Sequence, residues 1–413
     1  MTMHKRWLGL LMLLGACQMS LAAPGPAQID ALLMRQDYRQ VAPLMQALLA
    51  KRRPSEQERG LIYRWLFARD DGAELERRAS AGEAPVDRLA IGRLALELRD
   101  FARAEASFQQ ALAQATRAQD RAAAQKGLGQ LAFQRRDFDT AHTYLRASLA
   151  TEPSAEAWIA LGEVLIRLGR TEEAVAAAER SVALNPYQEL AHYQLGNGYT
   201  RKNYSQLAAQ YGPAFEQAMA LVRRASDAFE QGRFEQARSL SFQALRLCPE
   251  LGRAHAVLAK ALESQRLQID VHRADYERRF AATPMPQVPG IERYVSNWAQ
   301  LTPRHQKRVA LSVAPWKAFI PVLVEGGARH FIKPLYMRLS ETPAAQAMKD
   351  QRIEYDSRLW DDVRGMGGYN TVTGIEDVER SIFDRYNTVL HELSHQVHGI
   401  LTADQWREIQ ALY

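Results

Sequence analysis

Residues 158–186 read WIALGEVLIRLGRTEEAVAAAERSVALNP, and they carry the clearest structural signal in the chain. Their apolar residues recur at steps of three and four, which is the period of an amphipathic helix. Gly162 belongs to a series with Gly92, Gly129 and Gly196, whose members stand 37, 33 and 34 residues apart. A period of this length indicates stacked helical hairpins, in which small residues lie where two helices cross.

The same stretch resembles the tetratricopeptide repeat (TPR). Two positions depart from that pattern, since Leu165 replaces its tyrosine and Ala178 its phenylalanine; the matching positions are Trp158, Leu161, Gly162, Ala174 and Pro186. The resemblance implies a mostly α fold, with TPR-like helical repeats over residues 85–280 after an N-terminal helical segment over 24–84. Stacked hairpins form a concave surface, so we expect a protein partner in the TPR groove.

Composition places the chain among ordinary globular proteins. Of its 413 residues, 47% are hydrophobic and 24% are charged, which excludes collagen-like, disordered and multi-pass membrane classes. Two cysteines are too few for a disulfide scaffold. The net charge of +6 is small for this length, and arginine is scattered among acidic residues on the repeat helices. We therefore expect no nucleic-acid partner.

The N-terminus is typical of an export signal. Lys5 and Arg6 precede an apolar run over residues 7–14 that is too short to span a bilayer, so residues 1–23 are predicted to be a signal peptide. Two processing schemes stay open: cleavage at the small residues near Ala22, or acylation of Cys17 after the lipobox-like residues 14–17. A lone membrane anchor is the weakest alternative. The prediction is an exported protein, periplasmic or extracellular, with Cys17 as the candidate site of a lipid anchor.

A change of composition follows the repeats. Residues 281–290 contain three prolines and are predicted to be a linker, and residues 291–413 a second domain. Residues 308–313 and 321–324 have the apolar, β-branched character of short strands, and pairs of glycines mark turns. The second domain is therefore predicted to be mixed α+β.

The sequence His391-Glu392-Leu393-Ser394-His395 near the end of the chain is an H-E-x-x-H pattern. Residues four apart share one face of a helix, so His391 and His395 could hold a single Zn²⁺, and Glu392 could act as the general base. Zinc is the predicted cofactor, because it lowers the pKa of a bound water and polarises a carbonyl group. Asn387 and Gly399 are suitable residues to begin and end the helix.

Two segments together resemble the zinc-protease family of the anthrax lethal factor catalytic domain. They are residues 360–368, WDDVRGMGG, and residues 387–396, NTVLHELSHQ. The resemblance covers about the last quarter of the chain. It implies a zincin-type domain and a gluzincin metallopeptidase, in which the third zinc ligand is a glutamate on a later helix.

The sequence does not identify a third zinc ligand beside His391 and His395. Glu408 is the only glutamate after His395 and stands close to the motif, Asp404 is a weaker candidate, and His398 replaces the glycine of the metzincin pattern. The upstream His305 and His330 are further candidates that the sequence cannot place. Because the expected acidic helix is missing, the prediction is that residues 291–413 form a truncated copy of a longer protease domain.

Two functions compete on this basis. The first is an exported zinc metallopeptidase whose repeats recruit a protein or peptide substrate, or another protein partner. The second is a non-catalytic TPR adaptor of the cell envelope with an incomplete, inert peptidase domain. Zinc binding and hydrolysis distinguish the two.

Overall fold

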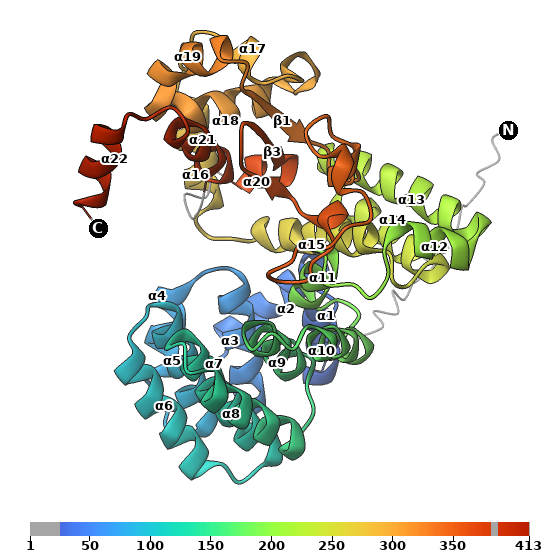
Figure 1. Cartoon of the computed structure of the whole chain (residues 1–413). Helices are drawn as coiled ribbons and strands as arrows, with labels where there is room; N and C mark the ends of the chain where they lie inside the picture. The colour runs from blue at the N-terminus through green and yellow to red at the C-terminus, as the bar shows by residue number, and fades with distance from the viewer. Residues whose placement is uncertain (1–24, 381–386, 413) are drawn as a thin grey trace, which may run out of the picture.

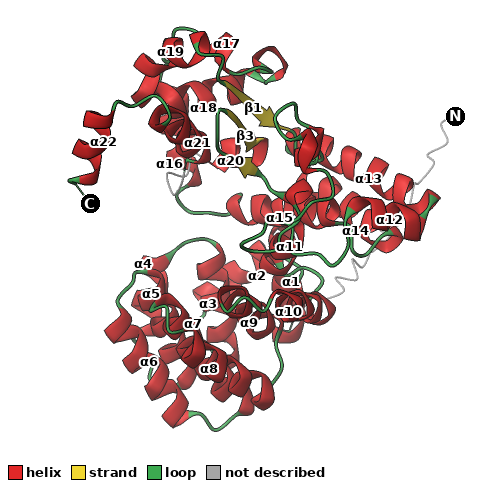
Figure 2. Cartoon of the chain, in the orientation of Figure 1, coloured by secondary structure: helices red, strands yellow, loops and turns green. Residues whose placement is uncertain are grey.

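The computed structural model describes residues 25–380 and 387–412, and helices make up most of this part (Figures 1 and 2). No helix within these ranges is long and apolar enough to cross a membrane. The predicted signal peptide, residues 1–23 with Cys17, lies outside the described residues, so its processing stays a prediction.

The first two-thirds of the described chain is a succession of helices, half of them paired as antiparallel hairpins. The hairpins are α5 with α6, α7 with α8, α9 with α10, and α13 with α14. The bounds are α1 Pro26–Met34, α2 Tyr38–Ala50, α3 Glu56–Ala68, α4 Gly72–Ala79, α5 Pro85–Glu97, α6 Phe101–Gln114, α7 Ala118–Gln134, α8 Phe138–Thr151, α9 Ala155–Arg167, α10 Thr171–Leu184, α11 Glu189–Gly196, α12 Tyr204–Tyr211, α13 Pro213–Glu230, α14 Phe234–Leu247, α15 Gly252–Leu267 and α16 Arg273–Ala282.

Each hairpin turns through one residue in the left-handed region of backbone space. These residues are Arg99, Arg136, Gly169 and Gly232, with φ angles of 60°, 65°, 72° and 74°. In two hairpins the next residue is an aspartate, Asp100 or Asp137, whose side chain accepts a hydrogen bond from the backbone of the second helix. The local sequence thus both ends one helix and begins the next.

The glycines of the series lie at helix crossings, as predicted. A Cβ atom at Gly92 would come within 2.7 Å of the Phe108 ring, and one at Gly129 within 2.8 Å of Leu145. Gly196 is the tightest case, because a Cβ there would lie 2.6 Å from the Cα atom of Ala256 on α15. The short helix α11 packs on α15 instead of on a following hairpin partner, so the array is irregular at this point.

We expect Gly196→Ala to destabilise the protein by about 1–3 kcal/mol, since the backbone of α15 would have to move. Gly162→Ala is the matched control, because a Cβ there meets first the flexible end of Gln194, at 3.1 Å. Alanine favours a helix over glycine by about 1 kcal/mol, so the control should be nearly neutral or stabilising. Urea unfolding of both variants measures the difference; equal midpoints would contradict the packing argument.

The N-terminal helices contact the end of the array. The backbone N–H of Val271 donates to the Arg69 carbonyl at 2.9 Å, and Ile269 packs against the core formed by α1–α5. The Gln36 amide donates to the Tyr187 carbonyl at 3.2 Å. The helices from α1 to α10 therefore curve into a ring that α11 and α15 close (Figure 1).

The C-terminal third contains a small sheet with helices around it. The strands, in the order β1-β3-β2, are β1 Arg329–Lys333, β2 Gly365–Met366 and β3 Asn370–Gly374; the helices are α17 Ile291–Tyr294, α18 Pro303–Val313, α19 Ile320–Glu325, α20 Ile375–Arg380, α21 Thr388–His398 and α22 Ala403–Gln410. β1 and β3 are parallel, with Phe331 opposite Val372, and β2 pairs antiparallel with β3.

The strands predicted at residues 308–313 and 321–324 are wrong, because both segments are helical. Thr302 caps α18 by accepting from the His305 backbone, and Pro303 follows in the first turn. Pro321 occupies the first turn of α19. Proline is well suited to that position in a helix, and an apolar run this short carries no period that separates a strand from a buried helix.

One hydrophobic core joins this region to the last repeats. Buried side chains of α12–α15 lie in the same cluster as those of α17–α21. Residues 283–290, within the predicted linker, have no regular secondary structure. The repeats and the C-terminal region therefore pack together, and the division at 281–290 stays a prediction.

Candidate metal site

Helix α21 presents two faces of opposite character. Val389, Leu393 and Val397 are fully buried against the core, whereas His391 and His395 are exposed. The Asn387 side chain accepts a hydrogen bond from the Leu390 backbone at 3.1 Å and begins the helix, as predicted. Gly399 caps its other end, also as predicted.

The rotation of α21 is fixed by Gln396, the residue after the second histidine. Its amide nitrogen donates to the carbonyl oxygens of Arg329, at 3.0 Å, and Tyr369, at 2.7 Å. Its amide oxygen accepts from the Tyr294 hydroxyl at 2.5 Å. These bonds cross from the helix to the sheet, so they hold the neighbouring His395 on the outer face.

The two histidines of the motif are placed as ligands of one metal would be. Their Nε2 atoms are 3.3 Å apart, and the rings are nearly perpendicular, at 88°. Two nitrogens bound to zinc at 2.0–2.1 Å in a tetrahedral arrangement would be about 3.3–3.4 Å apart. Partial burial and the neighbouring His395 lower the pKa of His391, which favours the neutral imidazole that binds a metal.

Glu392 lies beneath this pair and is almost entirely buried, with 7% of its surface exposed. Its Oε2 atom has no hydrogen-bond partner among the described residues. Burial raises the pKa of Glu392 to about 7, and the charge of Asp377 on α20 acts in the same direction. A buried carboxylate with an unsatisfied oxygen is costly, and a nearby cation would offset that cost.

The glycine-rich segment after residue 364 lies directly against these groups. A Cβ atom at Gly365 would lie 2.9 Å from Oε1 of Glu392, and one at Gly367 would lie 2.8 Å from Cδ2 of His395. Only glycine allows the backbone so close. The sequence singled out this segment through the family resemblance but did not predict the contact with the motif, for which the closely spaced glycines were the only signal.

No third ligand completes the pair within residues 25–380 and 387–412, where no group of three or more His, Cys, Asp or Glu side chains could hold a metal. The candidates have other partners. The His398 ring contacts the Trp406 ring, with their centres 5.1 Å apart, and Asp404 pairs with Arg407, while Glu408 lies on the exposed helix α22. His305 lies 3.5 Å from Glu379, and His330 is fully buried.

His330 has a structural role. Its Nε2 atom is 2.9 Å from the Thr373 hydroxyl, and its Nδ1 atom is 3.4 Å from the hydroxyl of Tyr294, which in turn holds Gln396. Burial lowers its pKa to about 3. A neutral histidine thus joins β1, β3 and α17 beneath α21.

Buried ion pairs anchor the segment that precedes the glycines. Arg364 binds both oxygens of Glu376, at 2.5 and 2.8 Å. Burial alone would raise the pKa of Glu376, but the charge and hydrogen bonds of Arg364 outweigh it and hold this pKa below its usual range. Asp362 accepts from the Arg253 side chain at 2.7 Å, which attaches the segment to α15.

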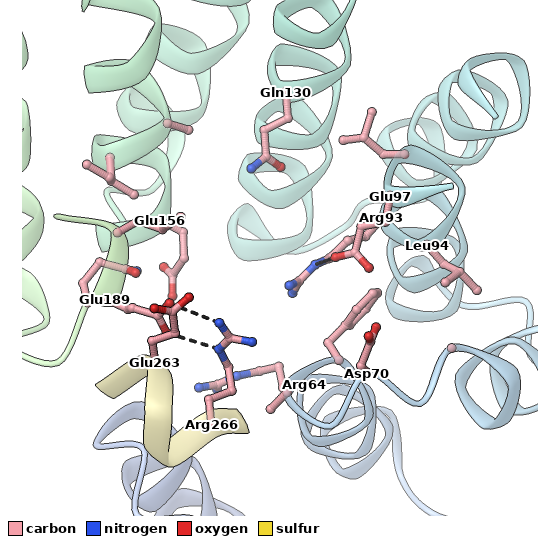
Figure 3. A pocket seen from close by; sticks show the side chains of 18 of the residues that line it. Arg64, Asp70, Arg93, Leu94, Glu97, Gln130, Glu156, Glu189, Glu263 and Arg266 are labelled. Atoms are coloured by element: carbon pink, nitrogen blue, oxygen red, sulfur yellow. Dashed lines mark hydrogen bonds and ion pairs between the residues drawn. The ribbon is translucent and has the colours of Figure 1, made fainter. Parts of the chain in front are cut away.

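A cavity of about 1320 Å³ lies inside the ring of repeat helices (Figure 3). Side chains of α3, α5, α7, α9 and α15 line it, and the ion pairs of Arg266 with Glu189 and of Arg93 with Glu97 stand on its wall. Its lining extends to Asp377 on α20 and Thr388, the first residue of α21. The cavity therefore reaches the helix that carries the H-E-x-x-H pattern.

Comparison with known protein families matches residues 89–141 and 127–189 to the tetratricopeptide repeat. A search of curated protein sequences finds no match to the chain. The chain thus contains TPR repeats, whose general role is to bind other proteins. The matched ranges cover most of α5 and all of α6 to α10, and α5, α7 and α9 among them line the cavity.

Proposed function

We propose that this chain is an exported zinc-dependent peptidase whose TPR repeats recruit its protein or peptide substrate. The observation that carries the proposal is the pair of Nε2 atoms 3.3 Å apart, above a buried carboxylate with an unsatisfied oxygen. His391 and His395 would hold the ion. A zinc ion in that position would act as a Lewis acid toward a peptide carbonyl.

The residues of the chain supply the rest of the chemistry. Glu392 would accept a proton at Oε2 from the attacking water, since this atom has no competing partner among the described residues. The backbone at Gly365–Gly367 lies beside Glu392 and His395, and it would form one wall of the substrate cleft. Export rests on residues 1–23, with Cys17 as the alternative site of a lipid anchor.

The second candidate function is a non-catalytic adaptor of the cell envelope. It is favoured by one observation, the absence of a third ligand beside His391 and His395 in the described ranges. In this case the repeats bind a partner protein and the C-terminal region has a structural role. Losing one of three protein ligands should weaken zinc binding strongly.

Equilibrium dialysis against zinc tests the proposal and separates the two functions. We expect about one zinc per chain, lost in His391→Ala and in His395→Ala, since the paired Nε2 atoms of these two histidines are the ligands of the proposed site. His398→Ala is the matched control, because this histidine lies on the same helix but contacts the Trp406 ring. Zinc binding that is unchanged in His391→Ala would reject the site.

A further inference from the structure

We propose that the cavity inside the repeat ring binds an extended cationic segment of a polypeptide, rich in lysine or arginine. The cavity also reaches α21, so the bound segment would lie beside the histidine face of that helix. This last step alone rests on the proposed function.

The size of the cavity suits a polypeptide. Its volume of about 1320 Å³ exceeds the roughly 300–1,000 Å³ of pockets that take small molecules. The ring is closed by contacts between α1–α3 and the residues that follow α15, so the cavity is held at a fixed width. A preformed space lowers the entropy cost of binding a flexible chain.

The charge of the lining points to a cationic ligand. Acidic side chains outnumber basic ones, nine to four, although the whole chain carries a net charge of +6. Four of the nine acidic side chains already form ion pairs: Glu97 with Arg93, Glu189 with Arg266, Glu76 with Arg103 and Glu263 with Lys260. Such a wall attracts lysine and arginine and repels nucleic acid and acidic peptides.

Two of these carboxylates are available to a ligand. Glu156 and Glu163 stand seven residues apart on α9, so they share one helix face, and neither forms a hydrogen bond or ion pair with another described residue. Both side chains are exposed, and the surrounding protein raises the pKa of Glu163 by partly removing its carboxylate from water, while the charge of Arg167 acts in the opposite direction. Lys126 on α7 and Arg93 on α5 act on Glu156 through their charges, without a hydrogen bond. A ligand ammonium or guanidinium group would stabilise both carboxylates.

Aromatic and apolar side chains lie between the charges. Phe67, Phe133, Tyr187 and Tyr276 line the cavity, and the guanidinium of Arg93 already stacks 3.9 Å from the centre of the Phe67 ring. Rings of this kind bind the apolar stems of lysine and arginine and attract their charged ends. The lining thus matches both parts of a long cationic side chain.

The cavity meets the candidate metal site through the N-terminus of α21. Thr388 lines the cavity, and His391 and His395 follow it by three and seven residues, on the same helix face. Asp377, whose charge acts on Glu392, belongs to the lining as well. A chain lying along the cavity would therefore come within reach of the exposed histidines.

Fluorescence anisotropy with the full-length chain tests the proposal. The probe is a fluorescein-labelled peptide of alternating arginine and alanine, and the comparison probe carries glutamate in place of each arginine. We expect only the arginine peptide to bind, with an affinity that falls as salt is added. In Glu156→Gln/Glu163→Gln the affinity should fall by about tenfold or more, since charge pairs of a partly enclosed site are lost.

The matched control is Glu216→Gln/Glu235→Gln, which removes two exposed carboxylates of α13 and α14 that lie outside the cavity. It should bind as the unaltered chain does. Peptide binding is measured in the Glu392→Gln variant without added zinc, so that no hydrolysis takes place during the assay. The cationic site and the proposed peptidase activity can then fail independently of each other. Equal binding of the two peptides, or equal loss in the two double variants, would overturn the cationic site.

Discussion

Glu392→Gln should lower peptide hydrolysis by about 10²–10⁴-fold, the usual contribution of a general base. Glutamine has the same shape and keeps the contacts with the backbone at Gly365 and Gly367, but it cannot take a proton from water. The measurement is the initial rate on a quenched fluorescent casein at saturating zinc. Zinc content should not change, since the ligands in the proposal are His391 and His395.

Glu408→Gln is the matched control for this prediction. Glu408 is one of the third-ligand candidates from the sequence, yet it lies on α22, a helix with no buried residue and away from the sheet (Figure 1). This variant should hydrolyse casein at the rate of the unaltered chain. Retained activity in Glu392→Gln would reject the mechanism, and lost activity with lost zinc in Glu408→Gln would restore that residue as a ligand.

The repeat region could be predicted because its helix packing depends on small residues that recur at a fixed spacing along the sequence. Gly92, Gly129 and Gly196 stand where a side chain would collide with the next helix, and this spacing repeats along the chain. The C-terminal strands could not be predicted in the same way. Residues 308–313 contain two valines, an alanine and a leucine, which suit a short strand, but Thr302 and Pro303 before them begin a helix instead.

Only part of the candidate metal site could be predicted from the sequence. The i, i+4 spacing placed His391 and His395 on one face, because helix geometry alone fixes that relation. The anchor at Gln396 depends on Tyr294, Arg329 and Tyr369, which are distant in sequence, so no local pattern indicates it. Zinc and the peptidase assignment stay predictions.

The contact between the repeats and the C-terminal region is the least predictable part of the fold. Arg253 and Asp362 are 109 residues apart, and both are almost completely buried, at 0% and 1% side-chain exposure. The guanidinium also donates to the carbonyl oxygens of Gly196 and Asp362, each at 2.7 Å, and the Tyr204 hydroxyl donates to the Asp362 carboxylate at 2.8 Å. A small set of hydrogen bonds thus joins α11, α12 and α15 to the segment before the glycines.

Asp362→Ala should lower the free energy of unfolding by about 3–5 kcal/mol, because it leaves the Arg253 guanidinium buried without its counter-charge. Urea unfolding followed by circular dichroism measures the loss. The C-terminal region should also unfold at a lower urea concentration than the ring, since Asp362 connects it to α15. A second transition, or earlier proteolysis after residue 290, would report that separation.

Two further variants show whether the loss of stability in Asp362→Ala comes from the unpaired buried charge. Glu105→Ala removes the partner of Arg135 in an exposed pair at 2.8 Å, and it should cost no more than about 1 kcal/mol. Arg253→Met/Asp362→Leu removes both buried charges and should recover part of the stability lost in Asp362→Ala, because no unpaired ion remains. A double variant as unstable as the sum of its single variants would mean that the two residues act independently. In that case the hydrogen bonds of Arg253 to the backbone carbonyls of Asp362 and Leu335, and not its charge pair, would hold the C-terminal region against the ring.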